Sequence, residues 1–251
     1  MSEFKGKTVL VTGTGGGLGR NMAEQFAGAG AHVHGCDINS ETNAATASML
    51  RENKLLFTGE TVDLGVPESV ANWVEQSASI SGNIDILVNN ASAARFKSMD
   101  EISIEDWRYT IRNELDSLFY TTKFSWPFLK KRGGVIINIA SVAAHHGSKA
   151  AGNTAHTATK GAILAMTRQL ALEGAAYKIR AVSISPGVVM TPGTAPMLSD
   201  PKVRSILEQN IPLGRPAQPG DIVSTIMFAA SDGARYWTGS DLVVDGGMIA
   251  G

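Results

Sequence analysis

Short apolar runs alternate with longer amphipathic stretches along the whole chain. The runs that read as strands, by their apolar and β-branched residues, are expected at 7–11, 31–37, 56–62, 84–89, 134–139, 180–184 and 242–244. Helical periodicity follows the first run and recurs at 67–80, 104–131, 154–175 and 219–230. Because strands separated by helices pair in parallel through crossovers, the pattern predicts an α/β fold with a doubly wound parallel sheet of about seven strands and helices on both faces.

Length and composition indicate one domain. The 251 residues are 43% apolar and 18% charged, without an internal repeat, a low-complexity tract or a linker. The longest irregular stretch, 187–214, is rich in Pro and Gly and carries one short helical pattern near 201–209. A loop of this length inside a compact domain is usually functional. We therefore expect a single domain over 1–251 with a substrate loop or lid at about 187–214.

Charge and cysteine content narrow the class further. The net charge is −1 and basic residues form no run, so neither a nucleic acid nor an anionic membrane surface is expected as a partner. No apolar run approaches the roughly 18 residues of a membrane span, and no signal peptide is visible, so a cytoplasmic location is expected. The single cysteine, Cys36, excludes an internal disulfide and falls in a strand expected to be buried and inert.

A glycine-rich segment, Thr12-Gly13-Thr14-Gly15-Gly16-Gly17-Leu18-Gly19, joins the first strand to the first helix. Glycine lets the backbone approach a pyrophosphate without an intervening side chain, and the helix N-terminus offers free N–H groups to the anion. A flexible turn is the alternative interpretation, but the strand before and the helix after favour a Rossmann-like dinucleotide site.

The second strand ends on Asp37, about 20 residues after the loop, where dinucleotide sites carry an acidic residue. A carboxylate there accepts both ribose hydroxyls of NAD and repels the 2′-phosphate of NADP. Neither Gly16 nor Ile38 is a basic residue that would hold that phosphate. NAD is therefore the expected cofactor, and the alternative role for Asp37 is a turn before the next helix.

Seven motifs occur in an order and at spacings that resemble one known family. They are Thr12-Gly13-x-x-x-Gly17-x-Gly19, Val62-Asp63-Leu64, Asn89-Asn90-Ala91-Ser92, Asn113, Ile139-Ala140-Ser141, Ser185-Pro186-Gly187 with Thr191, and the C-terminal third from Leu213-Gly214-Arg215 through Gly239 to Val244-Asp245-Gly246-Gly247. In this respect the chain resembles the short-chain dehydrogenase/reductase family from end to end.

The resemblance implies the roles of particular residues. It implies a catalytic group, without a metal, made of Asn113, Ser141, His156 and Lys160. It implies a cofactor site made of Gly13, Gly17, Leu18, Gly19, Asp37, Ile38, Asp63, Leu64, Asn90, Lys160, Pro186, Gly187, Val189 and Thr191. It also implies a homotetramer that packs its two long helices, 104–131 and 154–175, between subunits.

One position departs from the family pattern. The family places a tyrosine four residues before the lysine, whereas this chain has His156 four residues before Lys160. Residues four apart on a helix share a face, so both side chains are expected to point at the cofactor site. The charges of Lys160 and of oxidised nicotinamide oppose imidazolium, so a neutral ring is expected near pH 7, competent as a base and poor as an acid.

Three interpretations of His156 stay open. It acts as the base in an enzyme adapted to it; its role has passed to another group such as His145 or His146; or the chain binds NAD and turns over poorly. The stretch from Ser141 to His156 is slightly longer than is usual in the family, and one sequence does not separate a natural from an engineered substitution.

The remaining histidines and the substrate are less informative. His32 and His34 alternate on the second strand, and packing is favoured over metal binding because no third ligand lies nearby. His145 and His146 are expected to line the substrate pocket or face solvent. An apolar lining in 188–198 suits a partly apolar alcohol or ketone.

Taken together, the sequence predicts an NAD(H)-dependent oxidoreductase that interconverts a secondary alcohol and a ketone by hydride transfer. The alternative is an NAD-binding protein of this family type with impaired or repurposed catalysis. Neither the substrate nor the physiological direction follows from the sequence.

Overall fold

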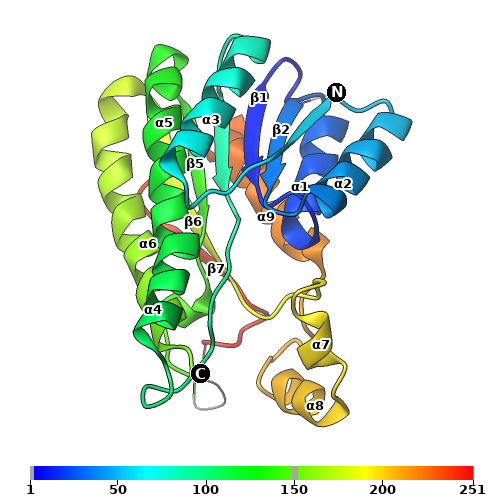
Figure 1. Cartoon of the computed structure of the whole chain (residues 1–251), viewed down its shortest axis with the longest axis vertical. Coiled ribbons are helices and arrows are strands. Elements are labelled where there is room, and N and C mark those ends of the chain that lie inside the picture. Colours follow the sequence, from blue (N-terminus) through cyan, green and yellow to red (C-terminus); the bar gives the residue numbers. More distant parts are fainter. Residues whose placement is uncertain (1–2, 149–151, 251) are drawn as a thin grey trace.

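The structure, a computed structural model, describes residues 3–148 and 152–250, and it is built around one seven-stranded parallel sheet of order β3-β2-β1-β4-β5-β6-β7 (Figure 1). The strands are β1 (Thr8–Thr12), β2 (His32–Asp37), β3 (Phe57–Thr61), β4 (Ile86–Asn89), β5 (Gly134–Ile139), β6 (Ile179–Pro186) and β7 (Asp241–Val244). The seven strands, their parallel pairing and the single domain that the sequence predicts are confirmed.

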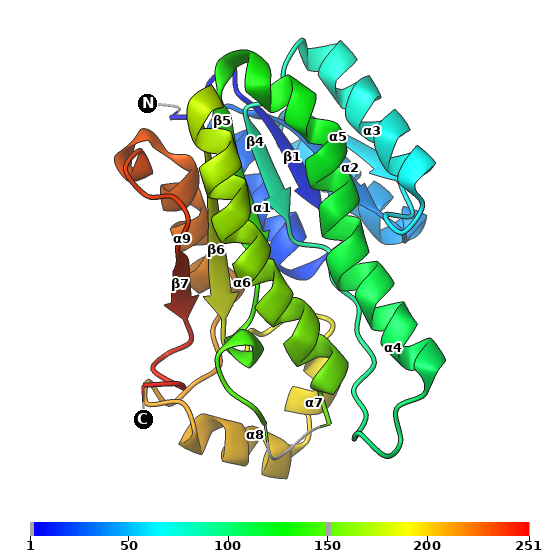
Figure 2. The same cartoon turned by 90° about the vertical axis from the view of Figure 1, so that its left-hand side faces the viewer.

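Helices cover both faces of the sheet, as Figures 1 and 2 show. One layer holds α1 (Gly17–Gly28), α2 (Ser40–Glu52) and α9 (Pro219–Ala230), and the other holds α3 (Pro67–Ser81), α5 (Ser117–Arg132) and α6 (Thr154–Gly174). Residues of β1 alternate between the layers: Val9 and Val11 pack with Met22 of α1, whereas Leu10 packs with Trp73 of α3. A strand buried on both faces explains why its sequence is continuously apolar.

The expected helix at 104–131 is continuous but not uniform. It consists of α4 (Ile104–Ile111), the π-helical turn η1 (Arg112–Asp116) and α5, and it runs beside α6 in Figure 2. Its start is fixed by a capping box between Ser103 and Asp106, and its end by Gly133, which has a φ of 79°. A π-helical turn inside a helix is rare and frequently marks a functional site.

Two helices were not predicted from the sequence. The first is α2, whose apolar residues are mostly alanine and form only a weak stripe. The second is the single turn α7 (Ala195–Leu198), which lies with α8 (Pro201–Gln209) in the expected lid segment and projects from the end of the sheet in Figure 1. The 3₁₀ turns are η2 (Val142–Ala144), η3 (Ala175–Tyr177) and η4 (Asp232–Ala234).

Cys36 is buried in β2 and free, and burial raises the pKa of its thiol well above the ordinary value. None of the helices over 3–148 and 152–250 combines the length and the apolarity needed to cross a membrane.

Candidate active site

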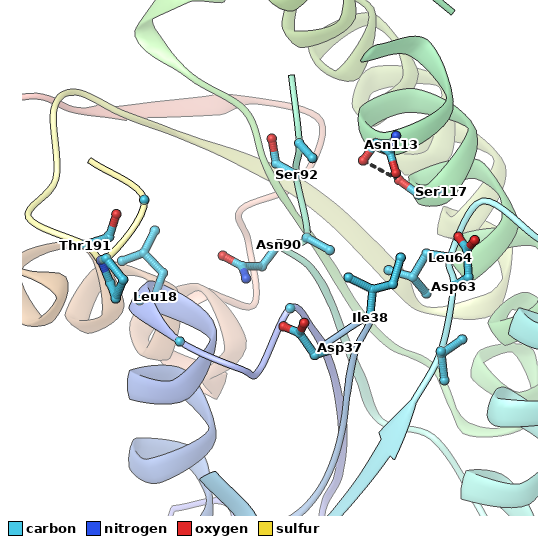
Figure 3. Close-up of a pocket in the computed structure, with 18 residues that line it drawn as sticks. Leu18, Asp37, Ile38, Asp63, Leu64, Asn90, Ser92, Asn113, Ser117 and Thr191 are labelled. Carbon is cyan, nitrogen blue, oxygen red and sulfur yellow. Dashed lines mark hydrogen bonds between the residues drawn. The ribbon is translucent and has the colours of Figure 1, made fainter. Parts of the chain in front are cut away.

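A cavity of about 390 Å³ opens at the carboxyl ends of the strands, around the point where the chain order reverses between β1 and β4 (Figure 3). Ligands of open α/β sheets bind at such reversal points. Of the residues expected at the cofactor, the cavity is lined by Gly13, Gly17, Leu18, Asp37, Ile38, Asp63, Leu64, Asn90 and Thr191. The structure therefore brings together residues at or after the ends of five different strands, β1, β2, β3, β4 and β6.

The glycine-rich loop has the geometry that its sequence predicts. Gly13 and Gly17 have φ values of 76° and 53°, and a side chain on Gly13 would lie 3.0 Å from Nδ2 of Asn90. That amide is fixed by its hydrogen bond to the carbonyl oxygen of Thr12, at 2.8 Å. Helix α1 begins at the cavity without a side chain capping its first N–H groups. These uncapped donors and the helix dipole suit the diphosphate of a dinucleotide.

Asp37 lies beside the glycine-rich loop, at the end of β2. Its two carboxylate oxygens accept from the N–H groups of Gly15 at 2.8 Å and of Asn39 at 2.9 Å. The neighbouring Ile38 is 66% exposed, and the cavity lining within the described residues includes no lysine or arginine. Arg20 is close to the loop, but its guanidinium already donates to the carbonyl oxygen of Gly15 at 2.7 Å.

Five residues expected at the cofactor do not line this cavity: Gly19, Lys160, Pro186, Gly187 and Val189. Gly19 serves packing, because a side chain there would fall on the carbonyl group of Gly13. Val189 is buried in the core and its backbone pairs with Ala217. Gly187 allows Asp245 to approach closely.

His156, on the first turn of α6, is bound to a carboxylate that the sequence did not single out. Its Nδ1 lies 2.9 Å from Oε1 and 3.1 Å from Oε2 of Glu114, which belongs to η1. The side chain of Glu114 is completely buried and that of His156 is 15% exposed. The ring of Phe96 lies beside the imidazole, with 5.4 Å between the centroids.

Four groups surround the carboxylate of Glu114: Ser92, Thr159, His156 and Lys160. The hydroxyl of Ser92 donates to Oε1 at 2.5 Å, and that of Thr159 donates to Oε2. Burial opposes ionisation, but the hydrogen bond from His156 and the charge of Lys160 outweigh it, so that the pKa of Glu114 is lowered to about 2. Glu114 is therefore an anion that only accepts hydrogen bonds at neutral pH.

Lys160 lies one turn further along α6, and its side chain is buried. Its ammonium donates to the carbonyl oxygen of Ile139 at 3.1 Å, which ties α6 to the end of β5. Burial lowers the pKa of Lys160, and the negative charge of Glu114 acts in the opposite direction. The lysine and the glutamate thus compensate each other's charge next to His156.

Ser141 and Asn113 occupy different surroundings. Ser141 caps η2, which packs against α6, and its hydroxyl accepts from the N–H of Ala143 at 3.1 Å. Asn113 lines the cavity, and its amide donates to the carbonyl oxygen of Tyr109 at 2.8 Å. Within the described residues, Asn113 makes no hydrogen bond to His156; the adjacent Glu114 does.

The sequence held one signal for Glu114. The buried residues of this helix, Ser117, Leu118, Thr121 and Ser125, continue at helical spacing from position 114. A glutamate on a buried stripe is rarely found without a partner. The family resemblance points to Asn113 and not to Glu114, because relatives have an asparagine at this place in the helix.

The other two histidines near the site differ in their contacts. His145 Nε2 lies 2.9 Å from Oδ2 of Asp241 and 3.3 Å from the hydroxyl of Ser185. His146 bonds through Nδ1 to the carbonyl oxygen of Gly147. Part of the longer stretch between Ser141 and His156, residues 149–151, lies outside the described residues. Within the described part of the chain, no group of three or more metal-ligating side chains is found.

Comparisons with known proteins agree with this architecture. Residues 13–249 match the family model described as enoyl-(acyl carrier protein) reductase. The chain is 36% identical to the 2-dehydro-3-deoxy-D-gluconate 5-dehydrogenase of Bacillus subtilis (strain 168), over 99% of this chain and 96% of that protein.

Two solved structures extend the likeness to the fold. A 7α-hydroxysteroid dehydrogenase complexed with NADH and 7-oxo glycochenodeoxycholic acid superposes with a TM-score of 0.93 at 28% identity, covering 98% of this chain and 95% of that one. A short-chain type dehydrogenase/reductase from Mycobacterium marinum gives a TM-score of 0.95 at 28% identity, covering 100% and 98%. The chain belongs to the short-chain dehydrogenase/reductase family of oxidoreductases.

Proposed function

We propose that the protein is an NAD(H)-dependent oxidoreductase that interconverts a secondary alcohol and a ketone, with His156 as the group that exchanges the proton. The observation that carries this proposal is the pairing of the imidazole with a buried anionic carboxylate next to Lys160. The arrangement adjoins the cavity on the side of Glu114, because the neighbouring Asn113 lines the cavity and so does Ser92, whose hydroxyl donates to Glu114.

The site residues have distinct tasks in this proposal. Gly13, Gly17 and the start of α1 receive the diphosphate of the dinucleotide, and Asp37 receives the ribose hydroxyls. The bound nicotinamide supplies the hydride chemistry. Ser141 donates a hydrogen bond to the substrate oxygen, and His156 accepts or returns the hydroxyl proton.

Two further roles follow the family resemblance. Lys160 holds the nicotinamide ribose, and its charge influences the ionisation of the groups around it. Asn113 anchors a water that leads toward solvent, and its place at the cavity lining is compatible with that task. Among relatives of this chain, the Azotobacter vinelandii enzyme is described as an L-rhamnose 1-dehydrogenase that uses NAD(P)⁺, which makes the choice of cofactor worth measuring.

The first test is cofactor selectivity, measured by fluorescence titration with NADH and NADPH. We expect at least tenfold tighter binding of NADH, equivalent to about 1.4 kcal/mol, because the carboxylate of Asp37 repels a 2′-phosphate. Asp37→Ala should narrow the difference, and Glu41→Ala, on the exposed first turn of α2, is the matched control. Equal affinities of the wild-type protein for NADH and NADPH would show that NAD is not the preferred cofactor.

The second test is turnover across a panel of secondary alcohols and ketones, followed at the nicotinamide absorbance. Wild type should act on at least one of them, and His156→Gln should lose about 10²- to 10⁴-fold in kcat, the usual contribution of a positioned acid/base. His145→Gln and His146→Gln test the alternative bases. A protein that binds NADH but turns over no member of the panel would instead be a binding module.

A further inference from the structure

His156 belongs to a hydrogen-bonded group centred on the carboxylate of Glu114. Three donors from different segments converge on the carboxylate of Glu114: the hydroxyl of Ser92 after β4, the hydroxyl of Thr159 on α6, and Nδ1 of His156. The side chain of Glu114 has no solvent exposure, so this arrangement satisfies a charge that water does not reach. Burying an anion in this way is costly unless every oxygen is hydrogen-bonded.

The ionisation of Glu114 determines which ring nitrogen of His156 carries a proton. A carboxylate has no hydrogen to donate, so a hydrogen bond between its oxygens and Nδ1 requires the proton to be on Nδ1. In a neutral imidazole the second nitrogen, Nε2, then has a free lone pair. Nε2 lies on the ring edge remote from Nδ1, and none of the described residues forms a hydrogen bond with it.

We propose that Glu114 is a positioning residue for His156, which holds the imidazole as the Nδ1–H tautomer, directs Nε2 to the substrate hydroxyl and stabilises the imidazolium that forms. This inference rests on the proposed function and adds to it the atom that exchanges the proton. During alcohol oxidation Nε2 takes up the hydroxyl proton of the substrate, and a bound dinucleotide would supply the acceptor for the hydride of the carbinol carbon. In ketone reduction the same imidazolium returns that proton to the substrate oxygen.

The charges around His156 are few and have known partners. Lys160, on the same helix, opposes imidazolium, and Glu114, on η1, favours it. On the η2 side, His145 is engaged by Asp241. Near α4, the guanidinium of Arg95 lies 4.3 Å from the ring centroid of Tyr109. Glu114 is thus the anion in direct contact with the ring, and its removal should change the protonation of His156 more than any other single substitution.

Side-chain ¹⁵N NMR of the protein without cofactor or substrate tests the tautomer directly. His156 signals are assigned by their loss in His156→Gln. We expect the neutral ring of the wild-type protein to carry its proton on Nδ1, with Nε2 showing the chemical shift of an unprotonated nitrogen. A neutral ring protonated mainly on Nε2 would overturn the proposal, and this outcome needs no variant at position 114.

Variants then test the part played by the carboxylate. In Glu114→Gln the side-chain amide can either accept from Nδ1 or donate to it, so the preference for the Nδ1–H tautomer should weaken. Glu114→Asp, which keeps a carboxylate that only accepts, should recover part of that preference. Asp241→Asn removes the carboxylate that faces His145 and should leave the His156 signals unchanged. A folded Glu114→Gln protein with an unaltered His156 tautomer would contradict the proposal.

Activity provides the last readout and separates the two proposals. Glu114→Gln should lower kcat about 10²-fold or more while KM changes little, and the acidic limb of the oxidation profile should move to lower pH. If no alcohol or ketone is turned over but the NMR shows the Nδ1–H tautomer in wild type and its weakening in Glu114→Gln, the positioning role stands and the proposed function fails. If turnover depends on His156 but not on Glu114, the proposed function stands and the positioning role of Glu114 fails.

Discussion

At the scale of single residues, the proposed chemistry depends on three ionisable side chains. His156 and Lys160 lie one turn apart on α6, and Glu114 lies on the neighbouring η1. The sequence predicts a positive charge, Lys160, near His156 and no negative charge to balance it, so a neutral imidazole that is a poor acid is expected. The structure adds the anion Glu114, whose carboxylate contacts the ring at 2.9 Å. In the proposed reaction, a neighbouring anion stabilises the imidazolium that forms during alcohol oxidation, and whether His156 is a poor acid, as the sequence predicts, stays a prediction.

Restoring the family tyrosine tests how far this site depends on histidine. We expect His156→Tyr to lower turnover, because a phenol has no counterpart of Nδ1–H and leaves Glu114 without one of its three donors. The double variant Glu114→Asn/His156→Tyr removes the uncompensated carboxylate and should recover part of the activity. Together with wild type and Glu114→Asn, these two variants form a double-mutant cycle measured as kcat/KM. A rise of about 10²- to 10⁴-fold in His156→Tyr alone would mean that the wild-type site is impaired.

At the scale of elements, the sequence predicted the strands and long helices to within a few residues, because their apolar periodicity is continuous and their ends carry glycine or capping residues. It did not predict the π-helical turn η1, since no local pattern signals one. Asn113, which was expected at the site, lines the cavity, and Glu114, the next residue of this turn, contacts His156.

A second element-scale feature is the histidine pair of β2. His32 and His34 lie on the face toward α3, with their ring centroids 4.2 Å apart, and both bond to the hydroxyl of Ser81. Burial, and then the neighbouring His32, lowers the pKa of His34 to about 4. Sequence alternation predicted the shared face, and the observed contacts are those of packed side chains.

The lowered pKa makes the fold sensitive to mild acid. The unfolded chain protonates His34 near pH 6.5 and the folded chain only near 4, so stability is lost as pH falls through this window. We expect His34 to contribute a loss of about 2 kcal/mol between pH 7.5 and 5. Urea unfolding at both pH values should show a smaller loss for His34→Gln than for wild type. Equal losses in the two proteins would show that His34 is not responsible.

At the scale of the whole molecule, the sheet order places the cavity at the reversal between β1 and β4. The helices that carry the residues proposed for catalysis, α4–α5 and α6, run side by side (Figure 2). Each of these helices exposes a large apolar side chain, Phe119 on α5 at 47% and Leu172 on α6 at 76%. Large exposed apolar side chains on adjacent helices are typical of subunit contacts.

The expected homotetramer is testable on that surface. Leu172→Arg should reduce the mass measured by light scattering during size-exclusion chromatography, because a charge at the centre of an apolar interface is not compensated. Ile206→Arg, at the 55% exposed site on α8, is the matched control and should leave the mass unchanged. A wild-type protein that elutes as a monomer would exclude the tetramer.

The sequence alone determined the parallel sheet, the glycine-rich loop, Asp37 and the exceptional His156, because each is written in local periodicity or in a motif of fixed spacing. Only the tertiary structure decided what His156 touches. Glu114, Ser92 and Thr159 lie on three segments separated by up to 67 positions, and their meeting depends on how α6 packs against η1. The charge state of a buried site is set by such contacts across elements, and it was therefore not readable from the residues around His156.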